Sequence, residues 1–475
     1  MAKFNSTNTI KTTNNSGHVA YSMGDKEKLV TQILTSFFNE KKYYGDNSEE
    51  MQEVINRVIK NDAKFVSNLA VFARREFNMR SVAHVLTAHL AHEAEGKPYV
   101  RKTVRGVSLR GDDLTEIMSF YISKFGKPIP NSLKNGINDV LASFDEYTLA
   151  KYKGAGKSVK MRDLLCLCRP TPKTEEQSAM WKRCLEGKLA IPETWETQLS
   201  ANGNNKETWE KLIDSGKVGY MALLRNLNNI IKANPSNIEK VFETIESPEN
   251  VRKSKQLPFR YLSAYKAVSD VATSRVFDML ENAIDASVDN IPKLSGTTVI
   301  AVDKSGSMSG KLSAKSTVKY FEIGMMLGLI ANRICDDSVF YTFNFAISKH
   351  PASHRNGILY STVTEGAYGG TNMYLPFKKM IEDGIKADRV IIISDNECNI
   401  GGENKTVQSI ADEYRIKSGN NIWVHAIDLQ GYGTQQFYGA RTNIIAGWSE
   451  KVFHFINIAE QGEGTLQKAI EDYEW

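Results

Sequence analysis

The sequence has few cysteines, no long apolar run and little net charge, and each shortage excludes a class of protein. Five cysteines are few and odd in number for 475 residues, which argues against a disulfide framework and for a reducing compartment. No apolar run approaches membrane-spanning length, and residues 1–20 contain no apolar core that could serve as a signal peptide. We therefore predict a cytoplasmic protein with no membrane partner, whose first 20 residues are polar and mobile.

Net charge is also small, because 60 Lys and Arg residues face 55 Asp and Glu residues, which leaves +5 at pH 7. Any nucleic-acid surface must therefore be local. The chain is too long for one ordinary core, so it should divide into two or three domains.

The apolar spacing is helical from about residue 25 to residue 290. Met51, Val54 and Val58, for example, follow the spacing of one buried helix face, and later segments keep this pattern. Strand-like alternation is nearly absent there, and no strict repeat is visible. This half is predicted to be an all-α array of packed helix pairs.

Beyond residue 297 the pattern changes to short β-rich runs separated by helical segments. The runs are TTVIAV, SVFYTFNF, RVIIIS and NIWVHAIDL, and helices are predicted over 314–334 and 405–418. Alternating strands and helices predict a parallel, doubly wound α/β sheet, whose ligands bind beyond the carboxyl ends of the strands.

The run TTVIAV leads into the loop DKSGSMSGK, in which Asp303, Ser305 and Ser307 offer oxygen atoms at alternate positions. The loop is not a phosphate-binding P-loop, because only three residues separate its glycines and no Ser or Thr follows its last lysine. Thr371, in the loop GGTN, and Asp395, after RVIIIS, add two more oxygen ligands. Such ligands suit a divalent ion, with Mg²⁺ favoured and Mn²⁺ as the alternative. A second possibility is that the hydroxyls only cap the following helix.

This constellation resembles the metal-ion-dependent adhesion site (MIDAS) of von Willebrand factor A domains, over residues 297–475. The resemblance implies that the two serines and the threonine touch the ion directly, whereas the two aspartates act through water or in mixed roles. It also implies that one position is left for an acidic group of a partner.

Three blocks precede this region: residues 147–169 (YTLAKYKGAGKSVKMRDLLCLCR), 219–229 (GYMALLRNLNN) and 257–268 (LPFRYLSAYKAV). In this order they resemble the TROVE module of the Ro ribonucleoprotein family. The resemblance implies a TROVE module over 21–295 and an A domain over 296–475. It also implies a ring of HEAT-like helical repeats closed by the A domain, with Y RNA on its outer face and single-stranded 3′ ends of misfolded RNA in its hole.

The first block is rich in cations. Its basic residues are Lys151, Lys153, Lys157, Lys160, Arg162 and Arg169. Only one acid in the same stretch, Asp163, opposes them, so the segment is either a phosphate-binding surface or a solvated run of charge. The Ro resemblance favours RNA contact here. A second basic cluster, in a predicted loop between helices, contains Lys97, Arg101, Lys102, Arg105 and Arg110.

Two smaller questions concern thiols and one arginine. Cys166, Cys168 and Cys184 lack a fourth ligand for a zinc site, so they are predicted to be buried free thiols. Arg225 either points into the ring that the resemblance implies or pairs with a buried carboxylate.

Taken with the Ro resemblance, the sequence predicts a non-catalytic RNA-binding protein, because no nuclease constellation is recognisable. Its expected partners are Y-like noncoding RNA and the 3′ ends of misfolded RNA, with a nuclease or another protein on the A domain of a monomer. The rival prediction is a metal-dependent protein-interaction module that grips an acidic partner residue. A metal-dependent hydrolase is a weaker rival, because the site lacks a general base.

Overall fold

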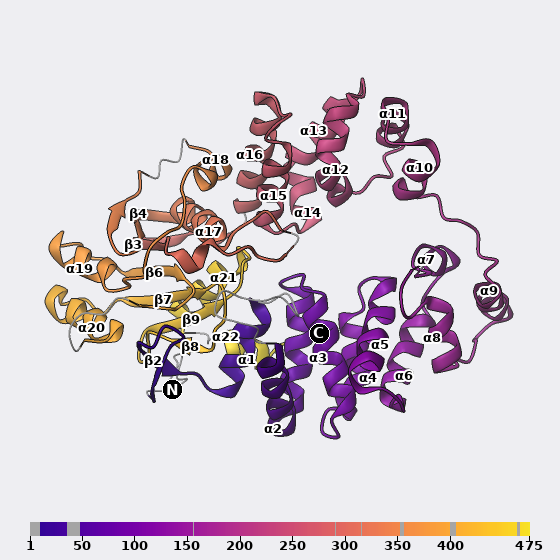
Figure 1. The fold of residues 1–475 in the computed structure, drawn as a ribbon, viewed down its shortest axis with the longest axis horizontal. Helices are drawn as coiled ribbons and strands as arrows, with labels where there is room; N and C mark the ends of the chain where they lie inside the picture. Colours follow the sequence, from indigo (N-terminus) through magenta and orange to yellow (C-terminus); the bar gives the residue numbers. More distant parts are fainter. Residues whose placement is uncertain are drawn as a thin grey trace. The chain divides into compact units, whose positions relative to one another are not determined.

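The computed structural model describes residues 10–35, 48–154, 156–289, 291–314, 316–351, 356–399, 405–462 and 466–475. Two compact units divide these residues (Figure 1). The helical unit holds the described residues within 25–35, 48–193 and 467–475. The mixed unit holds those within 10–24 and 194–466.

The helical unit is built from amphipathic helices. They are α1 (Asp25–Leu34), α2 (Ser48–Arg75), α3 (Ser81–His92), α4 (Lys97–Val107), α5 (Gly111–Phe125), α6 (Asn131–Leu141), α7 (Glu146–Lys151), α8 (Met161–Cys168) and α9 (Glu175–Leu185), followed by most of α22 (Leu466–Glu471).

Helix α4 corrects the loop that we predicted for the second basic cluster. Its Val100, Val104 and Val107 are buried at helical spacing, and Pro98 stands in its first turn. Arg101, Lys102 and Arg105 lie between these valines in sequence and are exposed, whereas Arg110 lies beyond α4, directly before α5. The cations between the valines interrupted the apolar pattern enough to hide the helix.

The last residues of the described chain pack on the same unit. The Asn68 side-chain amide donates to the carbonyl oxygens of Ile470 and Glu471, 3.1 Å away in each case. The Trp475 ring lies so close to Gly106 that a Cβ atom there would come within 2.6 Å of it. The helical unit is therefore completed by residues about 400 positions away in sequence.

From residue 194 on, the mixed unit first contains a second set of helices. They are α10 (Trp195–Asn202), α11 (Lys206–Asp214), α12 (Tyr220–Ala233), α13 (Ile238–Glu246), α14 (Pro248–Ser254), α15 (Pro258–Val268) and α16 (Ser274–Val288). Together with α1 to α9, they confirm the helical prediction for residues 25–290 wherever the structure describes them.

A six-stranded sheet follows. Its strands are β3 (Leu294–Asp303), β4 (Cys335–Phe343), β5 (Ile347–Lys349), β6 (Arg389–Ser394), β7 (Trp423–Asp428) and β9 (Thr442–Ala446). Their order is β5-β4-β3-β6-β7-β9, and only the β4–β5 pair is antiparallel. The predicted parallel sheet is thus confirmed, and the direction of its strand order switches between β3 and β6.

Helices cover both faces of this sheet. They are α17 (Tyr320–Ile334), α19 (Leu375–Glu382), α20 (Val407–Ser418) and α21 (Lys451–Gln461), while α18 (Ile358–Val363) packs on α16 and α17. Val299 and Ala301 of β3 join the core that includes α19 and α20, whereas Val302 lies close to Gly328 of α17. Alternate residues of one strand therefore enter opposite layers, as a doubly wound sheet requires.

The predicted start of α17, at residue 314, was wrong. A backbone bridge between Lys311 and Lys319 and a hydrogen bond from the Leu312 N–H to the Val318 carbonyl close a turn ahead of the helix. The Lys319 N–H then donates to the Glu322 carboxylate and begins α17 at Tyr320. Tertiary pairing overrides the helical pattern of this short stretch.

A small second sheet contains β1 (Lys11–Thr13), β2 (Val19–Ser22) and β8 (Thr434–Gln435). Tyr21 pairs with Lys11 in the hairpin and with Gln435 across the sheet. The structure therefore places strands within the N-terminal segment for which the sequence predicted mobility, and residues 1–9 lie outside the described residues.

Within the described residues, no helix combines the length and the apolar composition that crossing a bilayer requires.

A buried ion pair holds the amino end of β6. Arg389 donates to both carboxylate oxygens of Glu460, at 2.6 and 2.8 Å, and the Nε2 of His425 lies 3.0 Å from Glu460. Burial alone would raise the pKa of Glu460, but the hydrogen bonds from His425 and Arg389 lower it to about 2. Burial lowers the pKa of His425, so its ring is neutral and Arg389 carries the counter-charge.

Replacing Glu460 by Gln should destabilise the protein by about 3 kcal/mol near pH 7, because Arg389 keeps a buried charge without its partner. The ionised carboxylate stabilises the fold above its unfolded pKa and loses this effect as the pH falls towards about 2. The difference from wild type in urea titrations should therefore shrink below about pH 4.3. Glu413→Gln, which removes an exposed carboxylate, is the control and should change little. A difference that stays constant down to pH 3 would contradict the assignment.

Candidate functional site

Two carboxylates lie at the switch point of the sheet. Asp303 is the last residue of β3, and Asp395 directly follows β6, its parallel neighbour. Both side chains are fully buried. Burial raises the pKa of each, and the negative charge of Asp395 raises the pKa of Asp303 further. Two buried like charges are unfavourable without a proton or a cation between them.

The serine loop folds back over these carboxylates. The Ser305 N–H donates to Asp303 over 2.7 Å, the Ser305 and Ser307 hydroxyls lie 3.2 Å apart, and the Ser307 hydroxyl also hydrogen-bonds Asp395. Both serines are at most 5% exposed. Four of the five predicted ligands are thus brought together by contacts of the chain itself.

Thr371 reaches the same edge on a separate loop. The Gly306 N–H donates to the Gly369 carbonyl over 2.8 Å, and the Thr371 N–H donates to the Asn399 side chain over 2.6 Å. These bonds hold its loop against the serine loop on one side and the residues after β6 on the other. The buried Thr371 hydroxyl and one oxygen of Asp303 have no hydrogen-bond partner among the described residues.

The helix-capping alternative for the serines is wrong. Ser305 precedes a short 3₁₀ helix, Gly306–Ser309, but its side chain makes no capping hydrogen bond. Ser307 lies inside that turn, and α17 begins only at Tyr320 with Glu322 as its cap. Helix capping therefore does not explain why these two hydroxyls are buried here.

Sequence reasoning missed two residues of the third strand end. Asp428 closes β7, and Gln430 donates both to Asp395, over 3.4 Å, and to the Ser307 carbonyl, over 3.2 Å. The signal was present, because the run NIWVHAIDL places an aspartate at a strand end just as RVIIIS does. The negative charge of Asp428 adds to the effect of burial in raising the pKa of Asp395.

The N-terminal hairpin was missed without any sequence signal. The Asn14 side chain donates to the Cys398 carbonyl over 2.7 Å, and Asn15 donates to the Glu397 carboxylate over 3.0 Å. Both acceptors lie in the loop that follows β6. The hairpin therefore supports the loop that carries Asp395 and Asn399.

An exposed aromatic pair borders the same edge. Phe345 and Tyr368 are 55% and 56% exposed, and their rings meet edge to face at 6.1 Å. The Asn344 side chain donates to the Tyr368 carbonyl, and the Tyr368 N–H donates to the Lys304 carbonyl. The pair is thus fixed to the loops that carry the serines and Thr371.

The oxygen cluster offers the ligand types that hard divalent ions prefer. It offers hydroxyl and carboxylate oxygens, with no imidazole or thiol in the contacts described above. Among the described residues, no three His, Cys, Asp or Glu side chains group so as to hold a metal ion. A metal here would therefore depend on the hydroxyls as much as on the carboxylates.

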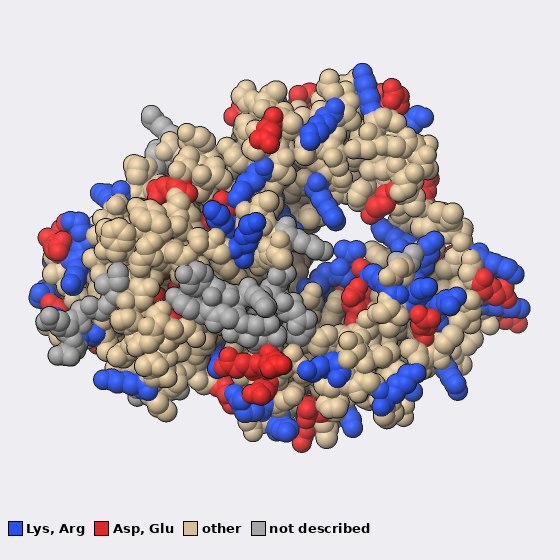
Figure 2. All heavy atoms as spheres, viewed as in Figure 1, with Lys and Arg blue, Asp and Glu red and all other residues tan. Residues whose placement is uncertain are grey.

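The basic segment runs from the end of α7 to the residue after α8. Figure 2 shows Lys and Arg side chains gathered over the region that α5, α7 and α8 occupy in Figure 1. Lys151 ends α7, Lys160 precedes α8, and Arg169 follows it. Lys153 and Lys157 lie in the intervening loop, and Arg162 lies in the first turn of α8.

Ion pairs divide these cations into two groups. Lys157 is 2.5 Å from Glu116 of α5, and Arg162 is 3.6 Å from Asp163. Lys153, Lys160 and Arg169 make no ion pair with any residue that the structure describes. The segment itself contains one acid, whereas folding brings two more from α5, Glu116 and Asp112, to Lys157.

Three smaller predictions have outcomes. Cys168 and Cys184 are buried free thiols, as predicted, but Cys166 is exposed because it lies on the outer side of α8. Arg225 is exposed and has no ion pair within the described part of the chain, so a buried carboxylate partner finds no support. In the second basic cluster, Arg101 is paired with Asp139 over 2.6 Å.

Comparisons with known proteins bear on both units. The sequence model of the TROVE domain family matches residues 26–187 and 178–294, together more than half of the chain. Telomerase protein component 1 of Rattus norvegicus is 26% identical over an alignment of 325 residues, which covers 50% of this chain and 12% of that protein. The Mus musculus protein of the same name is 25% identical over the same shares. The chain thus spans only about an eighth of these relatives.

A solved structure resembles the fold. The crystal structure of the Deinococcus radiodurans RO (RSR) protein matches with a TM-score of 0.65, over 93% of this chain and 100% of that one. The two sequences are 17% identical, so this likeness concerns the fold alone.

Replacing Asn14 by Ala should loosen the loop after β6. The substitution removes the hydrogen bond from Asn14 to the Cys398 carbonyl and those from the Ser16 and His18 N–H groups to Asn14, at a cost of about 1–3 kcal/mol. Hydrogen exchange at the Asn399 N–H, which donates to the Thr371 carbonyl, should accelerate relative to wild type. Lys11→Ala, at an exposed position of the same hairpin, is the control. Equal exchange at Asn399 in both variants would refute this role of the hairpin.

Proposed function

Because this chain belongs to the TROVE domain family, we propose that it is a non-catalytic RNA-binding protein that forms a ribonucleoprotein. Its ligands are Y-like noncoding RNA and the single-stranded 3′ ends of misfolded RNA, in RNA quality control or as a scaffold. The Ro resemblance of the three sequence blocks supports this choice of RNA. A nuclease, if one acts on the bound RNA, is a separate partner.

The observation that carries the proposal is a set of cations that make no ion pair in the described structure and lie between α7 and the residue that follows α8. Lys153, Lys160 and Arg169 lack carboxylate partners among the described residues, so phosphates can approach them without breaking an ion pair. Such contacts supply affinity without reading sequence. A chain that carries only +5 overall gains its RNA surface from this local excess.

Aromatic rings beside the segment favour single-stranded RNA. The Lys151 ammonium lies 5.4 Å from the ring centre of Tyr147 and 5.7 Å from that of Tyr152. Tyr147 is 48% exposed, so one face of a base can stack on it next to a bound phosphate. Bases of a duplex are not free to do so.

Removing Lys151 and Arg169 together should weaken binding to all RNA sequences alike. Each lost phosphate contact reduces the slope of log affinity against log salt by about 0.7 for a single strand, so the slope should fall by about 1.4. The measurement is a salt titration with a duplex that carries a 3′ single-stranded tail.

The matched control replaces Arg57 and Arg101 by Ala. It removes the same charge from the helical unit, but both residues lie outside the basic segment and are held in ion pairs, with Asp25 and Asp139. If the variant that lacks Lys151 and Arg169 keeps the slope and the affinity of wild type, the segment is only a solvated face.

We also propose that the oxygen cluster binds one divalent ion, with Mg²⁺ favoured over Mn²⁺. Ser305, Ser307 and Thr371 would be direct ligands, and Asp303 and Asp395 would act through water or directly. The buried oxygens of Asp303 and Thr371 that lack partners support this fit, as does the like-charged carboxylate pair. When bound, the ion would neutralise the carboxylates and offer a position to an acidic group.

Asp303→Ala should abolish binding of Mn²⁺, measured by electron paramagnetic resonance of the free ion, while circular dichroism of the helices stays unchanged. Wild type should also gain thermal stability with added Mg²⁺, and the variant should not. Glu365→Ala removes a carboxylate that pairs with Lys304 and His350 at the same edge, and it should bind the ion normally. Undiminished Mn²⁺ binding by the Asp303 variant would exclude the site.

The second candidate function is metal-dependent protein interaction through the α/β domain. The exposed Phe345 and Tyr368 beside the oxygen cluster favour it, because aromatic side chains are typical anchors of protein interfaces. Chelation separates the two functions. It would release a protein partner held through the ion and would leave RNA binding by the α7–α8 segment unchanged.

A further inference from the structure

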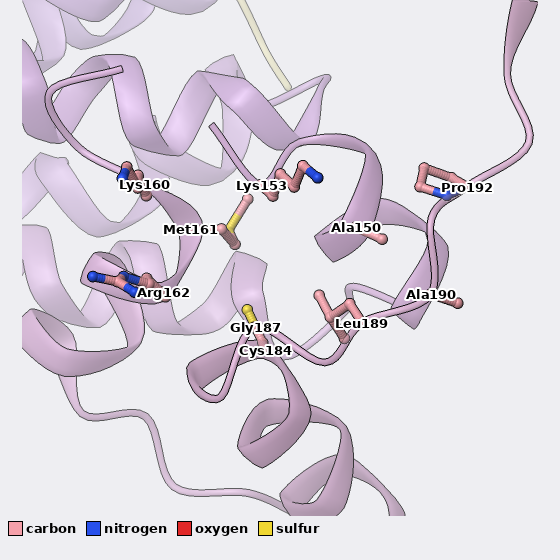
Figure 3. Close-up of a pocket in the computed structure, with 10 residues that line it drawn as sticks. All are labelled: Ala150, Lys153, Lys160, Met161, Arg162, Cys184, Gly187, Leu189, Ala190 and Pro192. Atoms are coloured by element: carbon pink, nitrogen blue, oxygen red, sulfur yellow. The ribbon is translucent and has the colours of Figure 1, made fainter. Parts of the chain in front are cut away.

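The helical unit contains a cavity of about 220 Å³ beside the basic segment. Three stretches form its walls, as Figure 3 shows: the end of α7 with the loop after it, the first turn of α8, and the end of α9 with its connector. The interior is mostly apolar. Its apolar walls include Ala150, Met161, Leu189 and Pro192.

Fixed contacts hold the connector wall in place. Arg183 of α9 donates to both carboxylate oxygens of Glu146, at 3.2 and 2.6 Å. The Ala190 N–H hydrogen-bonds the same carboxylate, and the Lys188 N–H donates to the Arg183 carbonyl over 2.8 Å. The cavity is therefore preformed by contacts between α7, α9 and the connector.

The charges around the cavity have one sign. Lys153, Lys160 and Arg162 line it, and no acidic residue does so in the described structure. Asp163 accepts the Lys160 N–H over 2.8 Å, caps α8 and lies 3.6 Å from Arg162. An anion at this cavity would thus meet Lys153 and Lys160, which make no ion pair with any residue that the structure describes.

An apolar interior with a cationic border suits a ligand that is flat and uncharged at one end and anionic at the other. A cavity below the roughly 300–1,000 Å³ of drug-sized sites has room for one small ring system. The polarisable thioether of Met161 adapts to a ring face. A nucleotide unit has this combination of base and phosphate.

We propose that this cavity takes one unstacked base of single-stranded RNA, while its phosphate is held by Lys153 and Lys160. The inference rests on the proposed RNA-binding function and adds to it a base-binding site. Because the interior is apolar and offers few polar atoms, it selects for an unpaired base rather than for a particular sequence. The other possible occupants are a free nucleotide and an acidic peptide with an apolar side chain.

The test fills the cavity without changing charge. Leu189→Trp places a large ring where Figure 3 shows the Leu189 side chain on the cavity wall, whereas Ile191→Trp places the same ring at a residue of the connector that is 78% exposed and does not line the cavity. We expect the first variant to bind the 3′-tailed duplex about tenfold more weakly, which is about 1.4 kcal/mol, and the second to bind as wild type. The salt slope should stay the same in both, because the phosphate contacts remain.

A second arm uses wild-type protein, so it does not depend on the folding of a variant. One abasic nucleotide is moved along the single-stranded tail, and at one position it should weaken binding about tenfold. The same abasic RNA should lose nothing further against Leu189→Trp, since the base and the cavity form one interaction. Thermal unfolding and circular dichroism check that both tryptophan variants fold.

The outcomes separate this inference from the function on which it rests. Wild type that binds no RNA would overturn both. RNA binding that is insensitive to Leu189→Trp and to every abasic position would overturn the base site alone. Tight binding of adenosine monophosphate or of an acidic peptide, lost in Leu189→Trp while RNA affinity is unchanged, would assign the cavity to that ligand and overturn the inference.

Discussion

The parallel pairing of β3 with β6 is the constraint on which the oxygen cluster depends. The chain leaves β3, crosses through α17 to β4 on one side, and later enters β6 on the other side. The loops after β3 and β6 therefore diverge, and two buried carboxylates end side by side at their base. Desolvation and like charge make that arrangement costly, so it is stable only with protons, hydrogen bonds or a cation to offset the cost.

Contacts of two kinds hold the two ends of β6. At the amino end of β6, Arg389 and Glu460 form an ion pair with good geometry, and His425 completes it. At the carboxyl end, Gln430 and the N-terminal hairpin support the loops by neutral hydrogen bonds. Because both ends of β6 are held by these contacts, the strand can hold the site at its carboxyl end in a fixed geometry.

The helical unit illustrates how pairing, rather than composition, decides which charges are available. Lys157 is neutralised by an acid on α5, whereas Lys153 and Lys160 have no ion pair in the described structure. Both also line a cavity whose other wall residues lie in α7, in α8, and in α9 with its connector. Free charge and an apolar cavity thus coincide because helices α7, α8 and α9 pack together, not because the segment is basic.

Four strands of the main sheet (β3, β4, β6 and β7), most helices and the five oxygen-bearing residues near the ends of β3 and β6 could be predicted from the sequence, because buried runs and the residues that end them are local signals in a parallel sheet. The prediction failed at α4, where cations interrupted the apolar stripe, and just ahead of α17, where the chain forms a turn closed by the bridge between Lys311 and Lys319. Only the tertiary structure decided that Gln430 and Asn14 support the site, that Glu116 neutralises Lys157, and that a cavity opens beside Lys160. Each of these joins residues distant in sequence, and such contacts exist only once packing has removed the intervening water and fixed the geometry.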